Sequence, residues 1–162
     1  MKNFLDQIFN NFKPSKEESK LFDEDTFYPA LLKDLNKCGA EVLIESPFIT
    51  TRRVELLLPA LRKIKKRRVR VALITRDPFS CDDEKSRISS LKAISELQKI
   101  GIQVICCEGL HRKLAILDRK ILYEGSLNIM SQSNSKEVMR RTYSAKACWQ
   151  MIGFTKLDRL LN

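Results

Sequence analysis

The sequence predicts an α/β fold, in which a mixed β-sheet is flanked by helices on both faces within a single domain. Helix and strand patterns alternate between Phe27 and Cys107, an order that joins parallel strands through helical crossovers. The strand patterns are short and continuously apolar, as in Val69–Thr75, which is typical of strands covered on both faces. Two later strand patterns are separated only by Arg119 and Lys120, so an antiparallel hairpin is expected to extend the sheet.

The segment before this pattern is expected to be an appendage. Residues 1–24 are assigned to it, and residues 25–162 are assigned to the folded domain. Within the appendage, the polar stretch Lys13–Lys20 is the best candidate for a linker. Three apolar residues recur at helical spacing and would share one helical face for packing against the domain or a partner: Phe4, Ile8 and Phe12.

Within the domain, three helices and three strands are expected to alternate before the hairpin. Periodic apolar residues set their bounds, and Gly39 and Gly101 end two of the helices. The helices are Phe27–Lys37, Arg53–Lys66 and Ser86–Lys99, and the strands are Glu41–Glu45, Val69–Thr75 and Ile102–Cys107. The hairpin strands are Lys113–Asp118 and Ile121–Glu124. After the polar segment Ser131–Ser135, a final helical region containing Trp149 is expected to reach the C-terminus.

Composition favours one folded domain in the cytoplasm. The chain has 162 residues, of which 43% are hydrophobic and 31% charged, and no apolar run is long enough to span a bilayer. Its N-terminus lacks the continuous apolar segment of a secretory signal. The five cysteines show no C-x-x-C spacing and are interpreted as reduced thiols. Cys107 and His111 could offer two zinc ligands, but a buried free cysteine is the favoured interpretation.

Positive charge is concentrated in two blocks. Lys and Arg total 30 against 20 Asp and Glu, which gives a formal net charge of +10. Residues 52–76 carry ten Lys and Arg against one acidic side chain, and residues 111–162 carry ten against four. Such an excess favours a polyanionic partner, either nucleic acid or an anionic membrane surface. A solvated helix face is an equal alternative for Lys63–Arg68 alone, but two separate blocks favour phosphate binding.

The only histidine stands in the most informative segment of the chain. His111 and Lys113 are two residues apart, so in an extended strand both side chains would face the same way. Ser126 and Asn128, again two apart, follow the hairpin and are expected to reach the same region. Imidazole, ammonium, hydroxyl and carboxamide groups together supply a nucleophile and donors for phosphate oxygens, which predicts a phosphate site.

These residues make the sequence resemble the phospholipase D superfamily, whose signature is H-x-K-x4-D followed by G-S-x-N. The signature residues present are His111, Lys113, Asp118, Gly125, Ser126 and Asn128. The likeness covers roughly residues 25–142. It is strongest to the phospholipase-D-like modules attached to some bacterial helicases, on the segments Glu45–Ile49, Val69–Val71, Gly125–Gln132 and Glu137–Arg141.

The resemblance implies a phospholipase-D-like sheet and a two-histidine mechanism without metal or cofactor. His111 would attack the phosphodiester phosphorus to form a phosphohistidine, and a second histidine would protonate the leaving oxygen and then activate water. Lys113 and Asn128, with Ser126, would hold the phosphoryl oxygens. Because one chain supplies one histidine, this chemistry requires a homodimer with the site on its two-fold axis.

Two carboxylates of the motif region have alternative interpretations. Glu137 matches the family glutamate that hydrogen-bonds the nucleophilic imidazole, but it also lies three residues after Asn134, as in a capping box, and both interpretations stay open. Asp118 is expected to have a structural, ion-pairing role in preference to proton transfer.

Four arginines are weaker candidates for binding backbone phosphate: Arg52, Arg53, Arg140 and Arg141. The last two are equally compatible with the basic end of a helical turn.

The sequence therefore predicts a phosphodiesterase, most readily an endonuclease, with nucleic acid as its partner. The two basic blocks suit a continuous phosphate backbone, and DNA is favoured over RNA. A helicase or repair protein is a further candidate partner. The first alternative is a non-catalytic DNA-binding module that serves a helicase. A phospholipase-D-type lipid hydrolase ranks third, because only the Phe4, Ile8 and Phe12 stripe resembles an interfacial helix.

Overall fold

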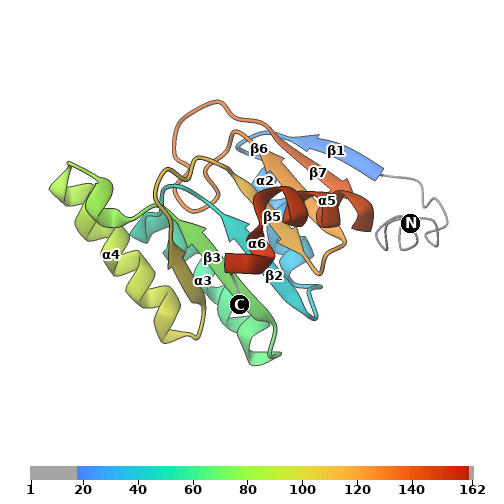
Figure 1. Ribbon diagram of the computed structural model, residues 1–162, viewed down its shortest axis with the longest axis horizontal. Coiled ribbons are helices and arrows are strands. Elements are labelled where there is room, and N and C mark those ends of the chain that lie inside the picture. The colour runs from blue at the N-terminus through green and yellow to red at the C-terminus, as the bar shows by residue number, and fades with distance from the viewer. Residues whose placement is uncertain (1–17, 161–162) are drawn as a thin grey trace, which may run out of the picture.

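The computed structural model describes residues 18–160, which form one seven-stranded mixed sheet with helices on both of its faces (Figure 1). The strands are β1 (Glu18–Phe22), β2 (Glu41–Glu45), β3 (Arg70–Thr75), β4 (Gln103–Cys106), β5 (Leu114–Leu117), β6 (Ile121–Gly125) and β7 (Met139–Tyr143). The helices are α2 (Phe27–Leu35), α3 (Thr51–Lys66), α4 (Glu84–Lys99), α5 (Ala145–Thr155) and α6 (Leu157–Leu160), with a 3-10 turn η1 at Pro78–Ser80.

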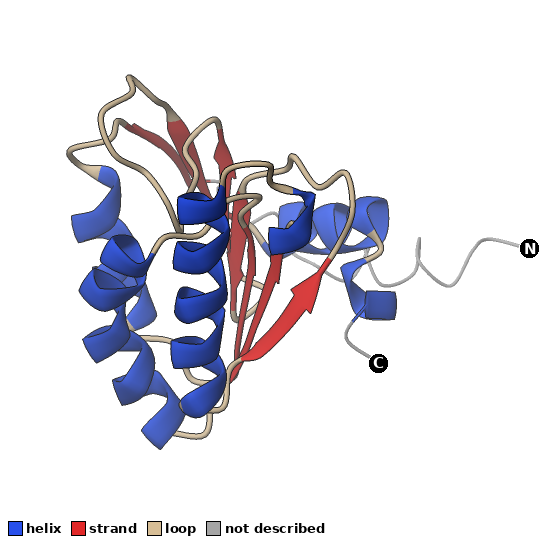
Figure 2. Ribbon diagram, turned by 90° about the vertical axis from the view of Figure 1, so that its left-hand side faces the viewer, coloured by secondary structure: helices blue, strands red, loops and turns tan. Residues whose placement is uncertain are grey.

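Two apolar clusters cover the two faces of the sheet. Helices α2, α3 and α4 pack on one face and α5 with α6 on the other, as the edge-on view shows (Figure 2). The strands β2 and β5 are buried at every position, which explains why β5 and the centre of β2 are apolar. The larger cluster contains Phe27, Leu61 and Tyr123, and the smaller one contains Leu43 and Ile152. The predicted fold class is thereby confirmed.

The sheet order is β1-β7-β6-β5-β2-β3-β4. Strands β2, β3 and β4 are parallel, whereas β5, β6, β7 and β1 continue the sheet in antiparallel pairs. This arrangement brings the carboxyl ends of β2, β3, β4 and β6 to the same edge as the amino ends of β5 and β7. Ligands of open α/β sheets bind beyond the carboxyl ends of parallel strands, so this edge is where a functional site is expected.

The structure differs from the sequence predictions at two outer strands. Glu18–Phe22, which lie in the segment assigned to the appendage, form β1 and pair with β7. Met139–Tyr143, expected to be helical, form β7, and the last helices begin only at Ala145. Both strands are rich in polar residues and gain their structure from pairing with distant segments, which local periodicity does not report. The Phe4, Ile8 and Phe12 stripe lies outside the described residues.

No helix in residues 18–160 is long and apolar enough to cross a membrane. Over the same residues no three His, Cys, Asp or Glu side chains are grouped to hold a metal ion, so Cys107 and His111 gain no further ligand. The five cysteines are free thiols.

Candidate active site

Two loops at one edge of the sheet bring together five of the predicted catalytic residues. His111 and Lys113 lie in the loop that leads into β5, and Ser126 and Asn128 lie in the loop that follows β6. Glu137 lies just before β7. Backbone bonds join these loops, since Gly125 N–H donates to the Lys113 carbonyl at 3.3 Å and Ser126 N–H donates to the Val138 carbonyl at 2.9 Å.

His111 and Lys113 contact one another directly. The Lys113 ammonium lies 3.3 Å from His111 Nδ1 and donates to the His111 carbonyl at 2.8 Å. The predicted juxtaposition is present, although both residues precede the strand in which it was expected. Partial burial lowers the pKa of Lys113, and the nearby Glu137 carboxylate opposes this shift. The imidazole is exposed beside a shallow pocket of about 340 Å³.

Arg112, between these two residues, points to the other side and fixes the loop. Its guanidinium donates two hydrogen bonds of 2.6 Å to Glu45, whose side chain is completely buried at the end of β2. A bidentate bond between arginine and carboxylate restricts both distance and orientation. The pair therefore anchors the loop at the same sheet edge from which His111 and Lys113 project.

Ser126 and Glu137 form the second side of the site. The Ser126 hydroxyl accepts a bond from Val138 N–H at 3.1 Å and is hydrogen-bonded to the Glu137 carboxylate. The bonds from Ser126 and Ser135 lower the pKa of Glu137, which keeps its carboxylate charged. A Cβ atom at Gly125 would overlap the Val138 backbone oxygen, so only glycine permits this close approach of β6 and β7.

The interpretation of Glu137 as part of a capping box is wrong, because no helix begins near Asn134. Glu137 instead extends into the site between Ser126 and Lys113. In this structure the carboxylate does not bond the His111 ring, whose polar side-chain neighbour is Lys113. The bond that the family resemblance implies between glutamate and histidine is thus absent within one copy of residues 18–160.

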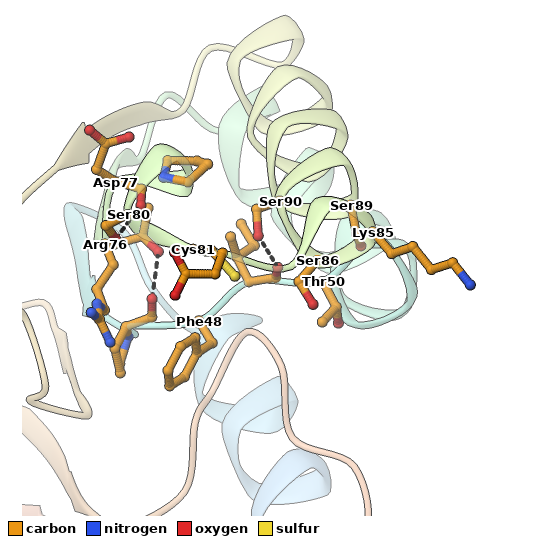
Figure 3. A pocket seen from close by; sticks show the side chains of 15 residues that line it. Phe48, Thr50, Arg76, Asp77, Ser80, Cys81, Lys85, Ser86, Ser89 and Ser90 are labelled. Carbon is orange, nitrogen blue, oxygen red and sulfur yellow. Dashed lines mark hydrogen bonds between the residues drawn. The ribbon is translucent and has the colours of Figure 1, made fainter.

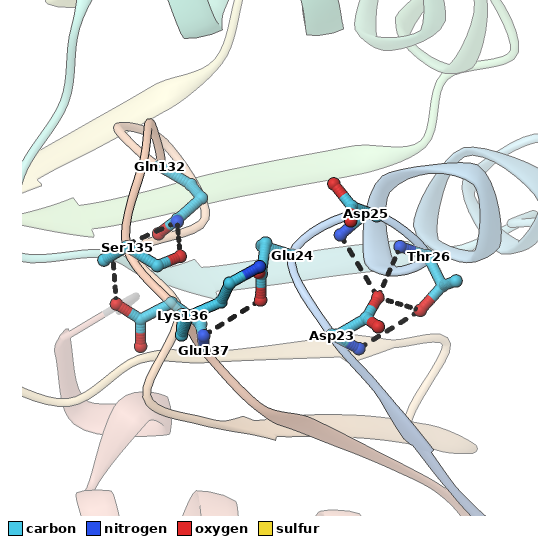
Figure 4. A network of polar contacts seen from close by, with 8 residues as sticks. All are labelled: Asp23, Glu24, Asp25, Thr26, Gln132, Ser135, Lys136 and Glu137. Carbon is cyan, nitrogen blue, oxygen red and sulfur yellow. Dashed lines mark hydrogen bonds and ion pairs between the residues drawn. The ribbon is translucent and has the colours of Figure 1, made fainter.

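A polar network outside the predicted site holds Glu137 in position (Figure 4). The Ser135 hydroxyl donates to Glu137 Oε1 at 2.6 Å, and Glu24 accepts the Glu137 backbone N–H at 3.0 Å. Glu24 also pairs with the Lys136 ammonium at 2.7 Å, and these bonds lower its pKa to about 2. Glu24 was not predicted to support the site, because the sequence does not reveal β1, the strand that precedes it.

Asn128 opens a tight turn that is tied to the β2–α3 loop. Its backbone carbonyl accepts bonds from Ser131 and Gln132 at 3.0 and 2.8 Å, while Met130 N–H donates to the buried Ser46 hydroxyl at 3.0 Å. In residues 18–160 the side-chain oxygen of Asn128 is buried without a hydrogen-bond partner. A buried polar atom without a partner is costly and is characteristic of functional positions.

Asp118 lies at the opposite end of β5 from the other motif residues. Its carboxylate accepts three backbone N–H bonds of 2.9 Å, from Gly39, Ala40 and Glu41. Seven residues separate it from His111, which corresponds to roughly 20 Å along a strand. Asp118 therefore closes the β5–β6 turn onto the start of β2, and it takes no direct part in chemistry at His111.

The four candidate phosphate-binding arginines fall into two groups. The Arg53 guanidinium lies 3.9 Å from the Tyr28 ring centroid and donates to the Gln132 carbonyl at 2.5 Å, and Arg141 pairs with Asp34 at 2.6 Å. The guanidinium groups of Arg53 and Arg141 are therefore engaged in structural contacts and are not available to bind phosphate. Arg52 and Arg140 are exposed, although Arg140 donates to the Ser19 hydroxyl at 2.9 Å.

Comparisons with known proteins agree with this geometry. The family model described as "Cardiolipin synthase, PLD-like domain" matches residues 31–153. No curated protein sequence matches the chain significantly.

Solved structures share the fold at low sequence identity. NucT from Helicobacter pylori is similar with a TM-score of 0.69 and 19% identity over 87% of this chain and 94% of that one. Nuc from Salmonella typhimurium, a phospholipase D family member, gives a TM-score of 0.67 and 16% identity over 86% and 91%. Phosphatidylserine synthase from Haemophilus influenzae gives 0.65 and 10% over 91% and 39%.

Proposed function

Since the chain belongs to the phospholipase D superfamily, we propose that it is a phosphodiesterase that cleaves the backbone of nucleic acid, DNA in preference to RNA, without a metal ion. The observation that carries this proposal is the contact of the single histidine, His111, with Lys113 beside Ser126 and Glu137. An exposed imidazole supplies a nucleophile, and the ammonium, hydroxyl and carboxamide groups supply donors for the phosphoryl oxygens.

The first step is attack by His111 on phosphorus. A bond forms between an imidazole nitrogen and phosphorus, and the bond from phosphorus to the leaving oxygen breaks. In the free protein the Lys113 ammonium donates toward Nδ1. For Nε2 to attack, Nδ1 must carry the ring proton, so Lys113 moves from the ring to the phosphate oxygens when substrate binds. Hydrogen bonds at catalytic sites commonly rearrange in this way on substrate binding.

A second histidine completes the reaction. It protonates the leaving oxygen, then removes a proton from the water that attacks phosphorus, and the nitrogen–phosphorus bond breaks to release His111. Because the chain has one histidine, the second must be His111 of another copy. The proposal therefore includes a two-fold homodimer in which two copies of this sheet edge face one another across one site.

The choice of nucleic acid as substrate rests on charge. Fold alone does not select the substrate, since the matched family model and one matched structure bear the names of lipid-synthesising enzymes. The net charge of +10, concentrated in two blocks, suits the continuous negative charge of a nucleic-acid backbone. The exposed side chain of Arg52, at the start of α3, is one element of that basic surface.

The test is cleavage of labelled single- and double-stranded DNA and RNA in excess EDTA at low salt. His111→Ala is expected to lower the cleavage rate by a factor on the order of 10³ or more, because it removes the nucleophile. Glu108→Gln, an exposed change in the same loop, is the matched control and should retain activity.

Three outcomes would contradict the proposal. Equal cleavage by His111→Ala and wild type would exclude the histidine mechanism. Binding without cleavage by wild type would favour a DNA-binding accessory module. Headgroup release from anionic vesicles without any cutting of nucleic acid would favour a lipid substrate.

A further inference from the structure

A pocket that the chemistry proposed above does not use lies beside the candidate active site. It has a volume of about 630 Å³, within the range of ligand-binding pockets, and opens beyond the carboxyl ends of β2 and β3. Phe48 follows β2, Arg76 follows β3, and Lys85 and Ser86 come from the first turn of α4 (Figure 3).

Phe48 offers an aromatic surface in this pocket. Phe48 is 47% exposed, although the loop that carries it is fixed. The loop is held on both sides, since the Ser46 hydroxyl donates to the Phe48 carbonyl at 2.9 Å and the Ser90 hydroxyl donates to the Ile49 carbonyl at 3.1 Å. The backbone that carries the exposed ring is therefore fixed, which lowers the entropic cost of binding a planar ligand.

The pocket also has a cationic side chain beside this ring. The Arg76 guanidinium lies 5.6 Å from the Phe48 ring centroid, and within residues 18–160 it forms no ion pair. Lys85 is exposed at the pocket rim, and its side chain extends away from Phe48 and Arg76 (Figure 3). The lining carboxylates are Asp77, which caps η1 by accepting Phe79 N–H at 2.9 Å, and the exposed Asp82. An aromatic ring beside an unpaired cation is the combination with which proteins bind single-stranded nucleic acid.

The backbone links this pocket directly to the active site. Thr50 N–H donates to the Met130 carbonyl and Met130 N–H donates to the Ser46 hydroxyl, both at 3.0 Å. Phe48 thus lies between two anchors to the turn that Asn128 opens. In the sheet, β2 alone separates β5 from β3, so the ends that carry Lys113 and Arg76 are about 10 Å apart. A few nucleotides of one strand span that distance.

We propose that this pocket is a base-binding subsite for single-stranded nucleic acid, in which an unpaired base near the cleaved phosphate stacks on Phe48 while Arg76 holds an adjacent phosphate. The proposal rests on the proposed function for its substrate and deepens it, because a base can enter the pocket only when it is unpaired. Single strands are then preferred over duplexes.

The test measures binding separately from cleavage. The protein is His111→Ala, and the probe is a single-stranded oligonucleotide of about 12 nucleotides, within the site size of known single-strand binders, with 2-aminopurine at successive positions. Phe48→Ala in this background is expected to weaken binding roughly tenfold or more and to abolish the fluorescence change of one stacked position. Phe48→Tyr should restore both. Phe154→Ala is the matched control, because Phe154 is 81% exposed on α5.

An oligonucleotide with abasic sites distinguishes base stacking from a loop defect. Its affinity should be the same for His111→Ala with and without Phe48→Ala, because it has no base to stack. The subsite would be contradicted if Phe48→Ala weakened the binding of abasic and normal strands equally, or weakened the binding of neither. It would also be contradicted if the protein did not bind single strands at all. Cleavage by the wild-type protein tests the proposed function separately. If a base stacks on Phe48 but the wild type does not cleave in EDTA, the subsite is supported and the nuclease function is contradicted. If the wild type cleaves and Phe48→Ala does not alter the cleavage, the nuclease function is supported and the subsite is contradicted.

Discussion

Asp118 is a motif residue that we expect to contribute to folding and not to chemistry. Three backbone N–H groups point at its carboxylate, and it lies at the far end of β5 from His111. Asp118→Asn replaces one acceptor oxygen by an amino group that faces donors. We expect it to lower the free energy of unfolding by about 2–3 kcal/mol, measured by urea denaturation, because hydrogen bonds to a charged group are lost.

The same variant should keep its cleavage activity per folded molecule. Burial raises the pKa of Asp118, but the three backbone bonds outweigh this effect and hold the pKa below its ordinary value. The stabilisation is therefore complete above that ordinary value and is lost as the pH falls through the lower folded value. Unchanged stability combined with lost activity would show that Asp118 acts in catalysis.

Arg112 supports the loop that carries His111 and Lys113 through its pair with Glu45. Arg112→Met leaves the buried Glu45 carboxylate without its two bonds, and we expect a loss of roughly 2 kcal/mol in the free energy of unfolding. Arg52→Met, which removes an exposed arginine, should change stability by less than about 0.5 kcal/mol. Similar unfolding curves for both variants would exclude the anchoring role of the Arg112–Glu45 pair.

Spacing predicted the residues of the candidate site, because His111, Lys113, Ser126 and Asn128 lie near strand ends that a hairpin brings together. It did not identify the residues that hold them. Glu45 and Arg112 pair across 67 positions of sequence, and Arg53 meets Gln132 across 79. Such contacts depend on how strands are ordered in the sheet, which no local pattern contains.

Among the secondary-structure elements, the parallel half of the sheet was predictable and the outer antiparallel strands were not. The central residues of β2 and β3 are buried and apolar, so the sequence itself indicates these strands. β7 carries two arginines in five residues and is a strand because it pairs with β6 and β1 and because Arg141 meets Asp34. β1 is mostly exposed and polar, so only its pairing with β7 defines it.

The turn after β1 has a consequence for activity, because Glu24 holds the loop that carries Glu137. Glu24→Ala removes the bond to Glu137 N–H and the pair with Lys136. We expect faster hydrogen exchange of the backbone amides in residues 132–138 and a turnover rate lower by about tenfold, since small misplacement of catalytic groups is costly.

Asp25→Ala is the control for this change, because the Asp25 carboxylate accepts no hydrogen bond within residues 18–160. It should leave both exchange and turnover unaltered. Equal behaviour of the two variants would show that the network of Figure 4 does not position Glu137.

The proposed mechanism needs two imidazoles at one phosphodiester, while this sequence contains one histidine. The proposed dimer, in which two copies share a single site, would supply both. It also predicts a specific activity that falls when the protein is diluted below the dissociation constant of the dimer.

The decisive measurement is activity of mixed dimers in excess EDTA. Wild type and His111→Ala are unfolded together in equal amounts, refolded to allow random pairing, and assayed on single-stranded DNA against the same amount of wild type refolded alone. If each site needs both histidines, only dimers with two wild-type chains are active, and activity per wild-type chain falls to about half. Glu108→Gln mixed with wild type in the same way should leave it unchanged. Undiminished activity per wild-type chain in the His111→Ala mixture would mean that one chain suffices, and would contradict the shared two-histidine site.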